Sequence, residues 1–415
     1  MRILMLANYY KPEQAASPYL GENRREAYAQ AGFEMVLYTP VPCRGISEEM
    51  RQEYAKRLYE EELDGKLKVH RFPLMKEGKN PIQRALRYTL SIWKLYRCAL
   101  KEKDIDVLSI SSTPPINGLM FPGIKKKLGC KIVYNLQDIF PDSLVTAKMA
   151  KKGGLLWKIG RKIEDLTYRN SDLIVVISED FKKNIMAKGV PEEKIVMIRN
   201  WVDENAVRQV AREDNDLFDT YGLGRNKFYV CYSGNIGLSQ NMDMLLDVAK
   251  SLQDNENIGF ILVGTGAYKK QVEARIEAEN IRNVTMLPFQ PYEKIGHVFS
   301  LGDCGLIISK KGIGQSSVPS KTWSVMSAER PVLASFDKGS ELDDIVTGSN
   351  CGICVEANDP DALRTAILQL AENKAACAEM GKNGRRYIEE NLTREIGTSK
   401  WVETMRRGVE GEQDK

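Results

Sequence analysis

Residues 312–335 join a loop rich in glycine and serine to a lysine and the start of a short helix. The run GIGQSSVPSKTWSVMSAERPVLAS places Lys321 in the expected first turn, which Pro319 suits because proline lacks an N–H group. Either Ser317 or Ser320 can cap this helix. The unpaired N–H groups of a first turn, the helix dipole and a cation together bind anions. We interpret the stretch as a diphosphate site; the alternative is a capped surface helix with a solvated lysine.

Two more glycine-rich loops follow expected strands in the second half of the chain. The strand at 229–233 ends in SGNIGLSQN, and the strand at 258–263 ends in GTG. Glycine lets the backbone approach a phosphate closely, and successive N–H groups can surround the anion. One such loop is a weak signal, but three loops at strand ends indicate a ligand that carries phosphate. The positions that we expect to bind it are Gly234, Asn235, Gln240, Gly264 and Gly266.

In the first half, two polar residues follow the apolar strand expected at 131–136. Gln137 and Asp138 come directly after this strand. Ligands of α/β domains bind at the carboxyl ends of strands, so we expect both side chains to face a cleft. The alternative for Asp138 is a cap of a helix or turn. The loop after the first strand contains Ala16, whose small side chain would let a ligand approach the backbone.

Composition excludes several classes of protein. The 415 residues suffice for two or more domains, and 43% hydrophobic with 28% charged residues is ordinary for a globular protein. A net charge of +4 without a basic aromatic patch does not indicate nucleic-acid binding. The N-terminal apolar run is too short for a secretion signal. Because no run of about 18 apolar residues exists, we expect a cytoplasmic protein without a membrane span.

The cysteines and histidines give no indication of a metal site. Eight scattered cysteines favour free thiols in the cytosol over a disulfide framework. Cys351 and Cys354 form a CxxC inside an expected strand, and without a second pair at zinc spacing we expect structural thiols. His70 and His297 also lack the spacing of metal ligands. We therefore expect no bound metal.

Apolar runs of strand length alternate with helical patterns along the whole chain. A strand near 2–8, a helix near 19–31 and a strand near 33–39 are how a doubly wound α/β domain begins. The same alternation starts again at residue 229, after a polar connection at 203–227. Two successive domains of this class imply a ligand cleft between them.

The expected helix at 80–103 is both apolar and basic. Its sequence NPIQRALRYTLSIWKLYRCALKEK is compatible with a helix that lies on a membrane surface. The alternative is a helix that packs on the core and keeps its basic face in water. A second basic cluster is Lys125–Lys127.

Four stretches together resemble one family. NLQDIFPDS, IRNWVD, SGNIGLSQNMDMLLDVA and VPSKTWSVMSAERPVLA look like the family 4 retaining glycosyltransferases of the GT-B fold. The chain is most similar to the bacterial O-antigen and capsule subgroup that includes the L-fucosamine transferases. The likeness extends from the first strand to GKNGRRYIEENL, and the NWVD and VPSK motifs are fairly specific for the subgroup.

This resemblance implies two Rossmann-like domains that face each other across a cleft, with a C-terminal helix that crosses back. Residues 1–203, with about 394–415, would form the acceptor-side domain, and residues 204–393 would bind the sugar nucleotide. Lys321 and the backbone after Ser320 would hold the diphosphate.

Other site residues are also implied by the resemblance. Asn235 and Gln240 stand where many relatives have arginine and lysine, and Gln137 stands beside Asp138 where many have a histidine near the donor sugar. The Glu-x7-Glu motif of the wider family falls on Ser316 and Ser324, which leaves the identity of the donor sugar open.

The implied activity is transfer of a sugar, an N-acetylated or deoxy amino sugar, from a UDP-sugar to a polyprenyl-diphosphate-linked or other saccharide acceptor. GDP is the second choice of nucleotide, and no cofactor or metal is required. The acceptor would place the protein at the inner face of the plasma membrane, with contacts at 80–103 and 125–127. Alternatives are a non-catalytic sugar-nucleotide-binding protein and a UDP-N-acetylglucosamine 2-epimerase. A dinucleotide oxidoreductase is disfavoured because GxGxxG is absent after the first strand.

Overall fold

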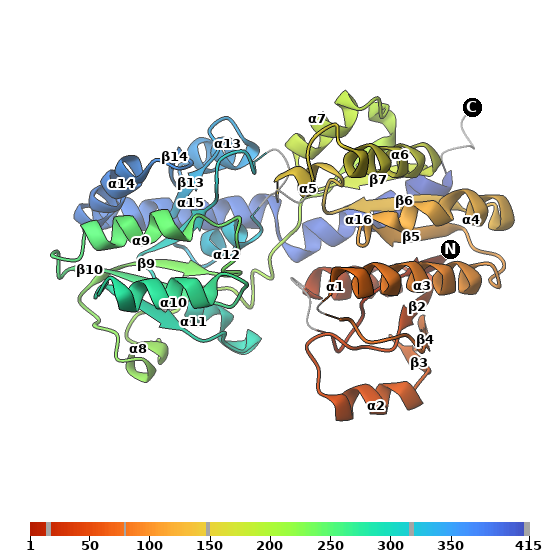
Figure 1. The fold of residues 1–415 in the computed structure, drawn as a ribbon, viewed down its shortest axis with the longest axis horizontal. Coiled ribbons are helices and arrows are strands. Elements are labelled where there is room, and N and C mark those ends of the chain that lie inside the picture. The colour runs from red at the N-terminus through yellow and green to blue at the C-terminus, as the bar shows by residue number, and fades with distance from the viewer. Residues whose placement is uncertain (14–17, 79, 147–149, 315–318, 411–415) are drawn as a thin grey trace. The chain divides into compact units, whose positions relative to one another are not determined.

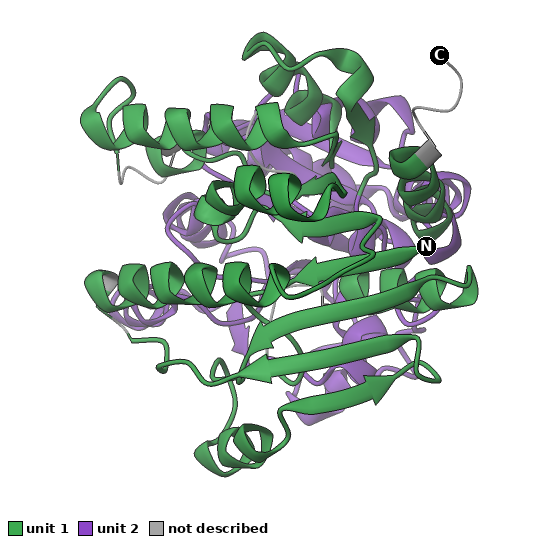
Figure 2. Ribbon diagram, turned by 90° about the vertical axis from the view of Figure 1, so that its right-hand side faces the viewer, with its two compact units in different colours: residues 1–199, 397–415 green, residues 200–396 purple. Residues whose placement is uncertain are grey.

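The computed structural model describes residues 1–13, 18–78, 80–146, 150–314 and 319–410 (Figure 1). The chain divides into two compact units, one of Met1–Arg199 with Gly397–Lys415 and one of Asn200–Ile396 (Figure 2). Each unit is a twisted sheet with helices on it, which confirms the predicted α/β class. Because the boundary at Ile396 lies inside the last helix, α16 (Arg394–Glu410), most of that helix belongs to the first unit.

The first unit contains an eight-stranded sheet in the order β3-β4-β2-β1-β5-β6-β7-β8. Every neighbouring pair is parallel except β3 with β4. This antiparallel pair was not anticipated from the sequence. The strands are β1 (Arg2–Leu6), β2 (Glu34–Pro40), β3 (Tyr59–Glu62), β4 (Leu67–Phe72), β5 (Val107–Ser111), β6 (Lys131–Leu136), β7 (Leu173–Val176) and β8 (Ile195–Met197).

Helices connect these strands and cover both faces of the sheet. The long helix expected at 80–103 is α3, which begins after the Asn80 cap and ends at Ala99. The helices of this unit before α16 are α1 (Pro18–Gln30), α2 (Glu48–Lys56), α3 (Pro81–Ala99), η1 (Pro115–Met120), α4 (Phe121–Leu128), α5 (Asp142–Thr146), α6 (Leu155–Asn170), α7 (Glu179–Ala187) and η2 (Glu192–Lys194).

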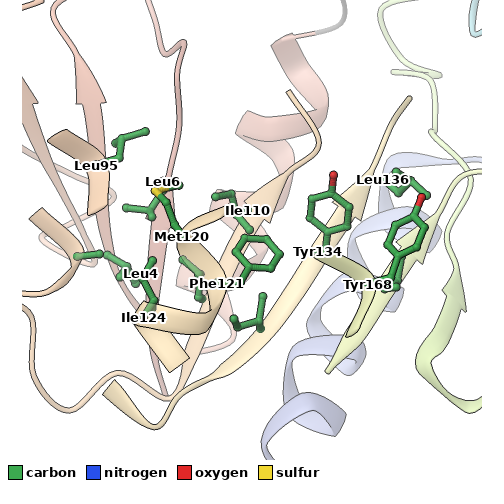
Figure 3. Close-up of a cluster of buried hydrophobic side chains, with 14 of the residues drawn as sticks. Leu4, Leu6, Leu95, Ile110, Met120, Phe121, Ile124, Tyr134, Leu136 and Tyr168 are labelled. Carbon is green, nitrogen blue, oxygen red and sulfur yellow. The ribbon is translucent and has the colours of Figure 1, made fainter. Parts of the chain in front are cut away.

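One core of the first unit lies between the sheet and α3, α4 and α6. Leu4 and Leu6 of β1 and Ile110 of β5 lie in one cluster with Phe121 and Ile124 of α4 (Figure 3). Parallel strands with both faces covered are almost continuously apolar, which is why short apolar runs predicted them well. The largest labelled side chains of the cluster are Phe121, Tyr134 and Tyr168.

Helix α16 contributes to the other face of the same sheet. A Cβ atom at Gly408 would lie 3.4 Å from Val133 Cγ2 and 3.7 Å from Leu173 Cδ1. The guanidinium of Arg24 on α1 lies 4.5 Å from the ring centroid of Trp401, which is buried. The end of the chain is therefore part of the first unit.

The second unit contains a six-stranded parallel sheet in the order β11-β10-β9-β12-β13-β14. Its strands are β9 (Phe228–Ser233), β10 (Ile258–Val263), β11 (Val284–Leu287), β12 (Cys304–Ile308), β13 (Val332–Phe336) and β14 (Gly352–Glu356). Its helices are α8 (Leu217–Thr220), α9 (Met242–Ser251), α10 (Lys269–Ala278), η3 (Tyr292–Lys294), α11 (Ile295–Phe299), α12 (Lys321–Ser327), α13 (Glu341–Gly348), α14 (Pro360–Glu372) and α15 (Lys374–Asn391).

In each sheet the direction of strand addition reverses once. In the second unit the chain adds β10 and β11 on one side of β9, and then β12, β13 and β14 on the other. Ligands of open α/β sheets bind beyond the carboxyl ends of the strands at such a reversal. The loops that follow β9 and β12 are therefore the expected position of a ligand site.

Candidate active site

Lys321 is the first residue of α12, a helix of only seven residues. Ser320 occupies the cap position, but its side chain makes no capping hydrogen bond, which differs from our expectation. The Thr322 N–H is instead bound by the Pro319 carbonyl at 2.9 Å. Because so short a helix has a small dipole, we attribute the positive charge of this site to the lysine ammonium group.

The ammonium group of Lys321 lies at the carboxyl end of β9. Its Nζ atom donates a hydrogen bond to Tyr232 Oη at 2.7 Å and lies 3.9 Å from the centroid of that ring. A Cβ atom at Gly234 would lie 3.2 Å from Nζ, so the missing side chain leaves room for the ammonium group. Among the described residues, no carboxylate approaches Lys321 Nζ within the 4.0 Å of an ion pair.

This lysine is partly buried, and its environment opposes its charge. Burial lowers the pKa of Lys321 to about 7, and no charged group in the described part of the chain compensates for it. A partly buried cation without a counter-ion favours the binding of an anionic ligand, because the ligand's negative charge would stabilise the ammonium form. The structure therefore places a candidate anion-binding cation at the topological reversal of the second sheet.

The backbones of the loops after β9 and β10 are in close contact. A Cβ atom at Gly264 would lie 1.9 Å from the Gly234 carbonyl oxygen, and one at Gly266 would lie 2.2 Å from the Ile236 oxygen. All three glycines have φ between +143° and +158°. Their conformation and close contact explain why glycine is needed here, whereas binding of phosphate by these loops stays a prediction.

Asn235 and Gln240 also hold this loop together. Tyr232 Oη donates to the Asn235 carbonyl at 2.5 Å, and Gln240 Oε1 accepts from the Gly237 N–H at 3.1 Å. The Lys310 N–H after β12 donates to the Ser239 carbonyl at 2.9 Å. The loops on the two sides of the reversal are therefore connected.

Two residues of this region were missed in the sequence. Asp337 directly follows β13, and its carboxylate accepts from the Gly312 and Gly314 N–H groups at 2.8 and 2.7 Å. The rule that selected Asp138, an acid immediately after an apolar strand, would also have selected Asp337. Tyr232 lies inside β9, where no sequence signal separates it from other core aromatics.

Gln137 and Asp138 lie in the first unit, directly after β6 as predicted. Gln137 Nε2 donates to Asn135 Oδ1 at 2.7 Å, and its backbone N–H donates to Ser112 Oγ at 3.1 Å. The Asp138 side chain is exposed, yet surrounding protein desolvates it and raises its pKa, while a hydrogen bond with Ser143 opposes the rise. Asp138 also borders a small cavity together with Tyr168.

Of the remaining predicted site residues, one lies among the described residues and two do not. Ser324 lies on α12 and is partly buried. Ala16 and Ser316 lie outside the described residues. Within the described ranges, no group of three histidine, cysteine or acidic side chains could hold a metal ion, and Cys351 and Cys354 are buried free thiols.

The two units match two known domain families. Residues 23–206 match glycosyltransferase family 4, and residues 213–387 match the glycosyl transferases group 1. Two Rossmann-like α/β domains of these families are the GT-B class of fold. This chain, with its group 1 and family 4 domains, is a glycosyltransferase.

Several similar proteins are from bacteria. The chain is 27% identical to the probable glycosyltransferase WbjE of Pseudomonas aeruginosa over 72% of this chain and 74% of that protein. It is 26% identical to the putative colanic acid biosynthesis glycosyl transferase WcaI of Escherichia coli K12, over 98% of this chain and all of that protein. The crystal structure of Anabaena Alr3699/HepE in complex with UDP covers 98% of this chain and 100% of that chain, with 15% identity and a TM-score of 0.73.

Proposed function

We propose that this glycosyltransferase moves an N-acetylated or deoxy amino sugar from a UDP-sugar to a lipid-linked or other saccharide acceptor in the synthesis of a bacterial surface polysaccharide. The observation that carries the proposal is the ammonium group of Lys321, which has no counter-ion among the described residues and lies at the reversal of the second sheet. The printed name of WcaI supports the polysaccharide class, and the UDP complex of HepE supports the nucleotide.

The proposed chemistry is electrostatic. As the bond between sugar and diphosphate breaks, negative charge grows on the diphosphate, and Lys321 stabilises it without a metal. The acceptor hydroxyl attacks on the face of the leaving group, and the departing diphosphate oxygen takes up its proton, so the configuration is retained. The proposed C-terminal domain, residues 204–393, binds the sugar nucleotide, with Ser316, Ser320 and Ser324 near it.

The first unit supplies the acceptor side of this mechanism. The proposed acceptor-side domain spans residues 1–203 and about 394–415, and Ala16 is assigned to binding of the sugar nucleotide. We assign Gln137 and Asp138 to catalysis, and the raised pKa of Asp138 suits a group that holds a proton for part of the cycle.

The test is release of UDP when a lipid-linked saccharide is added to the full chain with a UDP-sugar. We expect release that depends on the acceptor, together with thermal stabilisation by UDP that exceeds stabilisation by GDP. Stabilisation without release would favour the second candidate, a non-catalytic sugar-nucleotide-binding protein, to which Ser324 in place of a glutamate points. No stabilisation by either nucleotide would contradict both.

We also propose that the protein contacts the membrane that carries its acceptor. Over the described part of the chain, no helix is long and apolar enough to cross a bilayer. However, α3 exposes Ile82, Leu86 and Trp93 to solvent, by 77%, 52% and 54%. Between Glu77 and Glu102 the chain has no acidic residue, so this surface also carries only positive charge.

A second helix has the same character. At the start of α6, Leu155, Leu156 and Ile159 are exposed by 77%, 52% and 48%. The chain has no acidic residue between Asp142 and Glu164. Exposed apolar side chains surrounded by cations are typical of surfaces that bind anionic bilayers.

These two helices share one edge of the first unit. Both α3 and α6 contact η1 and begin at the carboxyl edge of the sheet, since each follows the end of a strand. The Lys125–Lys127 cluster, by contrast, lies in the last turn of α4, and Lys125 forms an ion pair of 2.8 Å with Asp172. We therefore give the α3 and α6 surface the larger part in membrane contact.

A further inference from the structure

Tyr232 lies against the ammonium group of Lys321 and contacts two parts of the proposed nucleotide site. Its hydroxyl accepts a hydrogen bond from Lys321 Nζ at 2.7 Å and donates one to the Asn235 carbonyl at 2.5 Å. Its side chain is fully buried, at the position before the last residue of β9. One tyrosine thus connects the strand, the loop after it and α12.

Both halves of this side chain favour the protonated form of Lys321. The ring centroid lies 3.9 Å from Nζ, where the negative face of an aromatic ring attracts a cation. The hydroxyl has one proton, and because that proton is donated to Asn235, the oxygen is left to accept from the lysine. Burial acts in the opposite direction, since it removes water from the ammonium group.

Other titratable groups near α12 do not contribute to this balance. Among the elements that contact α12, β12 contributes the Cys304 thiol and β13 has no titratable side chain. From α15, Arg385 binds the Ser327 carbonyl at the far end of α12. Lys310 follows β12, and the described residues bind it through its backbone N–H, which donates to the Ser239 carbonyl. Burial alone lowers the pKa of Lys321 to about 7.

We propose that Tyr232 is a positioning residue for the diphosphate of the nucleotide, and that ligand binding draws a proton onto Lys321. The inference rests on the proposed function of the site. Before binding, Lys321 is partly a neutral amine at neutral pH. The diphosphate stabilises the ammonium form, so the amine takes a proton from the buffer and forms one N–H bond, while no covalent bond of protein or ligand breaks.

The sign of the pH dependence follows. Below pH 7 the free protein already holds the proton, so binding needs no uptake and affinity is highest. As the pH rises above about 7, the free amine must first be protonated, and affinity falls until the pH reaches the higher pKa of the complex.

Proton uptake is measured by titration calorimetry of the full chain with UDP-N-acetylglucosamine and with UDP, near pH 7.5, in two buffers of different ionisation enthalpy. Because burial lowers the pKa of Lys321 to about 7, we expect net uptake of part of a proton for each UDP-N-acetylglucosamine bound, whereas UDP also has a terminal phosphate that titrates near this pH. The diphosphate of a UDP-sugar does not titrate in this range, so the proton belongs to the protein. Binding with no difference between the buffers would overturn the inference.

The role of Tyr232 is tested by Tyr232→Phe, which keeps the ring and removes the hydroxyl. Loss of one hydrogen bond to the ammonium form should move the midpoint of the affinity profile about 0.5–1 pH unit lower. Lowering the pH should then restore binding. A residue with a merely structural role would lower the melting temperature and leave this midpoint in place, and that result would overturn the role of Tyr232.

The matched control is Tyr229→Phe, on the same strand but on its opposite face. Tyr229 packs against Phe218 with 6.1 Å between ring centroids, in a separate core cluster. We expect this variant to keep the wild-type midpoint, and an equal shift in both variants would count against the assignment to Tyr232. If neither nucleotide binds the wild type even at pH 6, the proposed function itself fails. Binding without proton exchange contradicts only the present inference.

Discussion

The charge of Lys321 works against folding of the free protein. The unfolded chain keeps this amine protonated up to its ordinary pKa of 10.5, whereas the folded protein lowers that pKa to about 7. Between these values the unfolded state binds more protons, so stability rises with pH. The destabilisation is full below pH 7 and fades as the pH approaches 10.5. A group that opposes folding in this way is a candidate for function rather than for stability.

Replacement of this lysine should separate stability from activity. We expect Lys321→Met to raise or maintain the melting temperature of the free protein at pH 7, because a buried charge is removed. Stabilisation by UDP should disappear, and turnover should fall at least tenfold, since loss of one such electrostatic group typically raises a barrier by about 2.7–4 kcal/mol. Differential scanning fluorimetry and UDP release measure the two effects.

The matched control for that experiment is Lys250→Met. Lys250 forms an exposed ion pair of 3.0 Å with Glu279 in the same unit, away from the loops of the site. Its loss should change melting and turnover little. Full turnover in Lys321→Met would eliminate the electrostatic mechanism.

Gly234 offers a steric test of the same site. A Cβ atom there would lie 3.2 Å from Lys321 Nζ, and φ of +143° disfavours any other residue. We expect Gly234→Ala to displace the ammonium group and weaken UDP affinity at least tenfold, as measured by calorimetry. Gly348→Ala is the control, because nothing lies within 4 Å of its Cβ position. Equal affinities in the two variants would show that the position of Nζ is unimportant.

Among individual residues, those that belong to a recognisable local motif could be predicted from the sequence. Lys321 and Gly234 belong to loops whose glycine and serine content is visible in the sequence itself. Tyr232 contacts Asn235, which is 3 positions away in the sequence, and Lys321, which is 89 positions away. Only the contact with Lys321 depends on the fold of the whole unit. Its partner on α12 could be known only after β9 and α12 had been brought together.

Among the elements, α3 and α6 carry the prediction about membranes. The double variant Leu155→Ser with Leu156→Ser should reduce flotation with vesicles that contain anionic lipid, because it removes about 1.5–3 kcal/mol of apolar burial for each fully inserted side chain. High salt should weaken wild-type flotation, since each basic residue near the surface contributes about 1 kcal/mol.

The control for flotation is Phe289→Ser. Phe289 is 74% exposed but belongs to the second unit, outside the α3 and α6 surface. Its replacement should leave flotation unchanged. If wild-type protein does not float with anionic vesicles even at low salt, the basic helices are simply solvated faces.

The β3–β4 pair shows where element prediction fails. Strand β3 has the sequence YEEE and was not among the strands expected from the sequence. Glutamate is uncommon in strands, so local preference gives no signal. The strand forms because β4 offers an open edge and because Arg71 forms an ion pair with Glu60 at 2.5 Å. Such tertiary pairing is absent from the local sequence, whereas the apolar strands β6 and β10 were predicted with their observed bounds.

At the scale of the whole molecule, helix α16 near the C-terminus contributes to the stability of the first unit. Trp401 of α16 is buried in the first unit, against Arg24. We expect Trp401→Ala to destabilise that unit by about 3–5 kcal/mol in urea unfolding. Stabilisation of the chain by UDP should persist, because the proposed nucleotide site lies in the second unit. Glu403→Ala, an exposed position of the same helix, is the control. Equal stability of the two variants would contradict this role of α16.

The alternation of strands and helices predicted two α/β domains, but it did not predict the order of strands in either sheet. That order depends on which edge each new strand joins, and this choice is made by packing of helices against the faces. The reversal beside β9, which gives the site its location, therefore became visible only in the folded molecule.

An ammonium group without a carboxylate partner has a practical consequence for the choice of buffer. Sulfate, phosphate or citrate in the solution can occupy the same position as the nucleotide, since each offers Lys321 the negative charge that the described protein does not supply. Kinetic constants measured in such salts will include this competition. Assays in chloride or acetate at low ionic strength will report the enzyme closer to its unoccupied state.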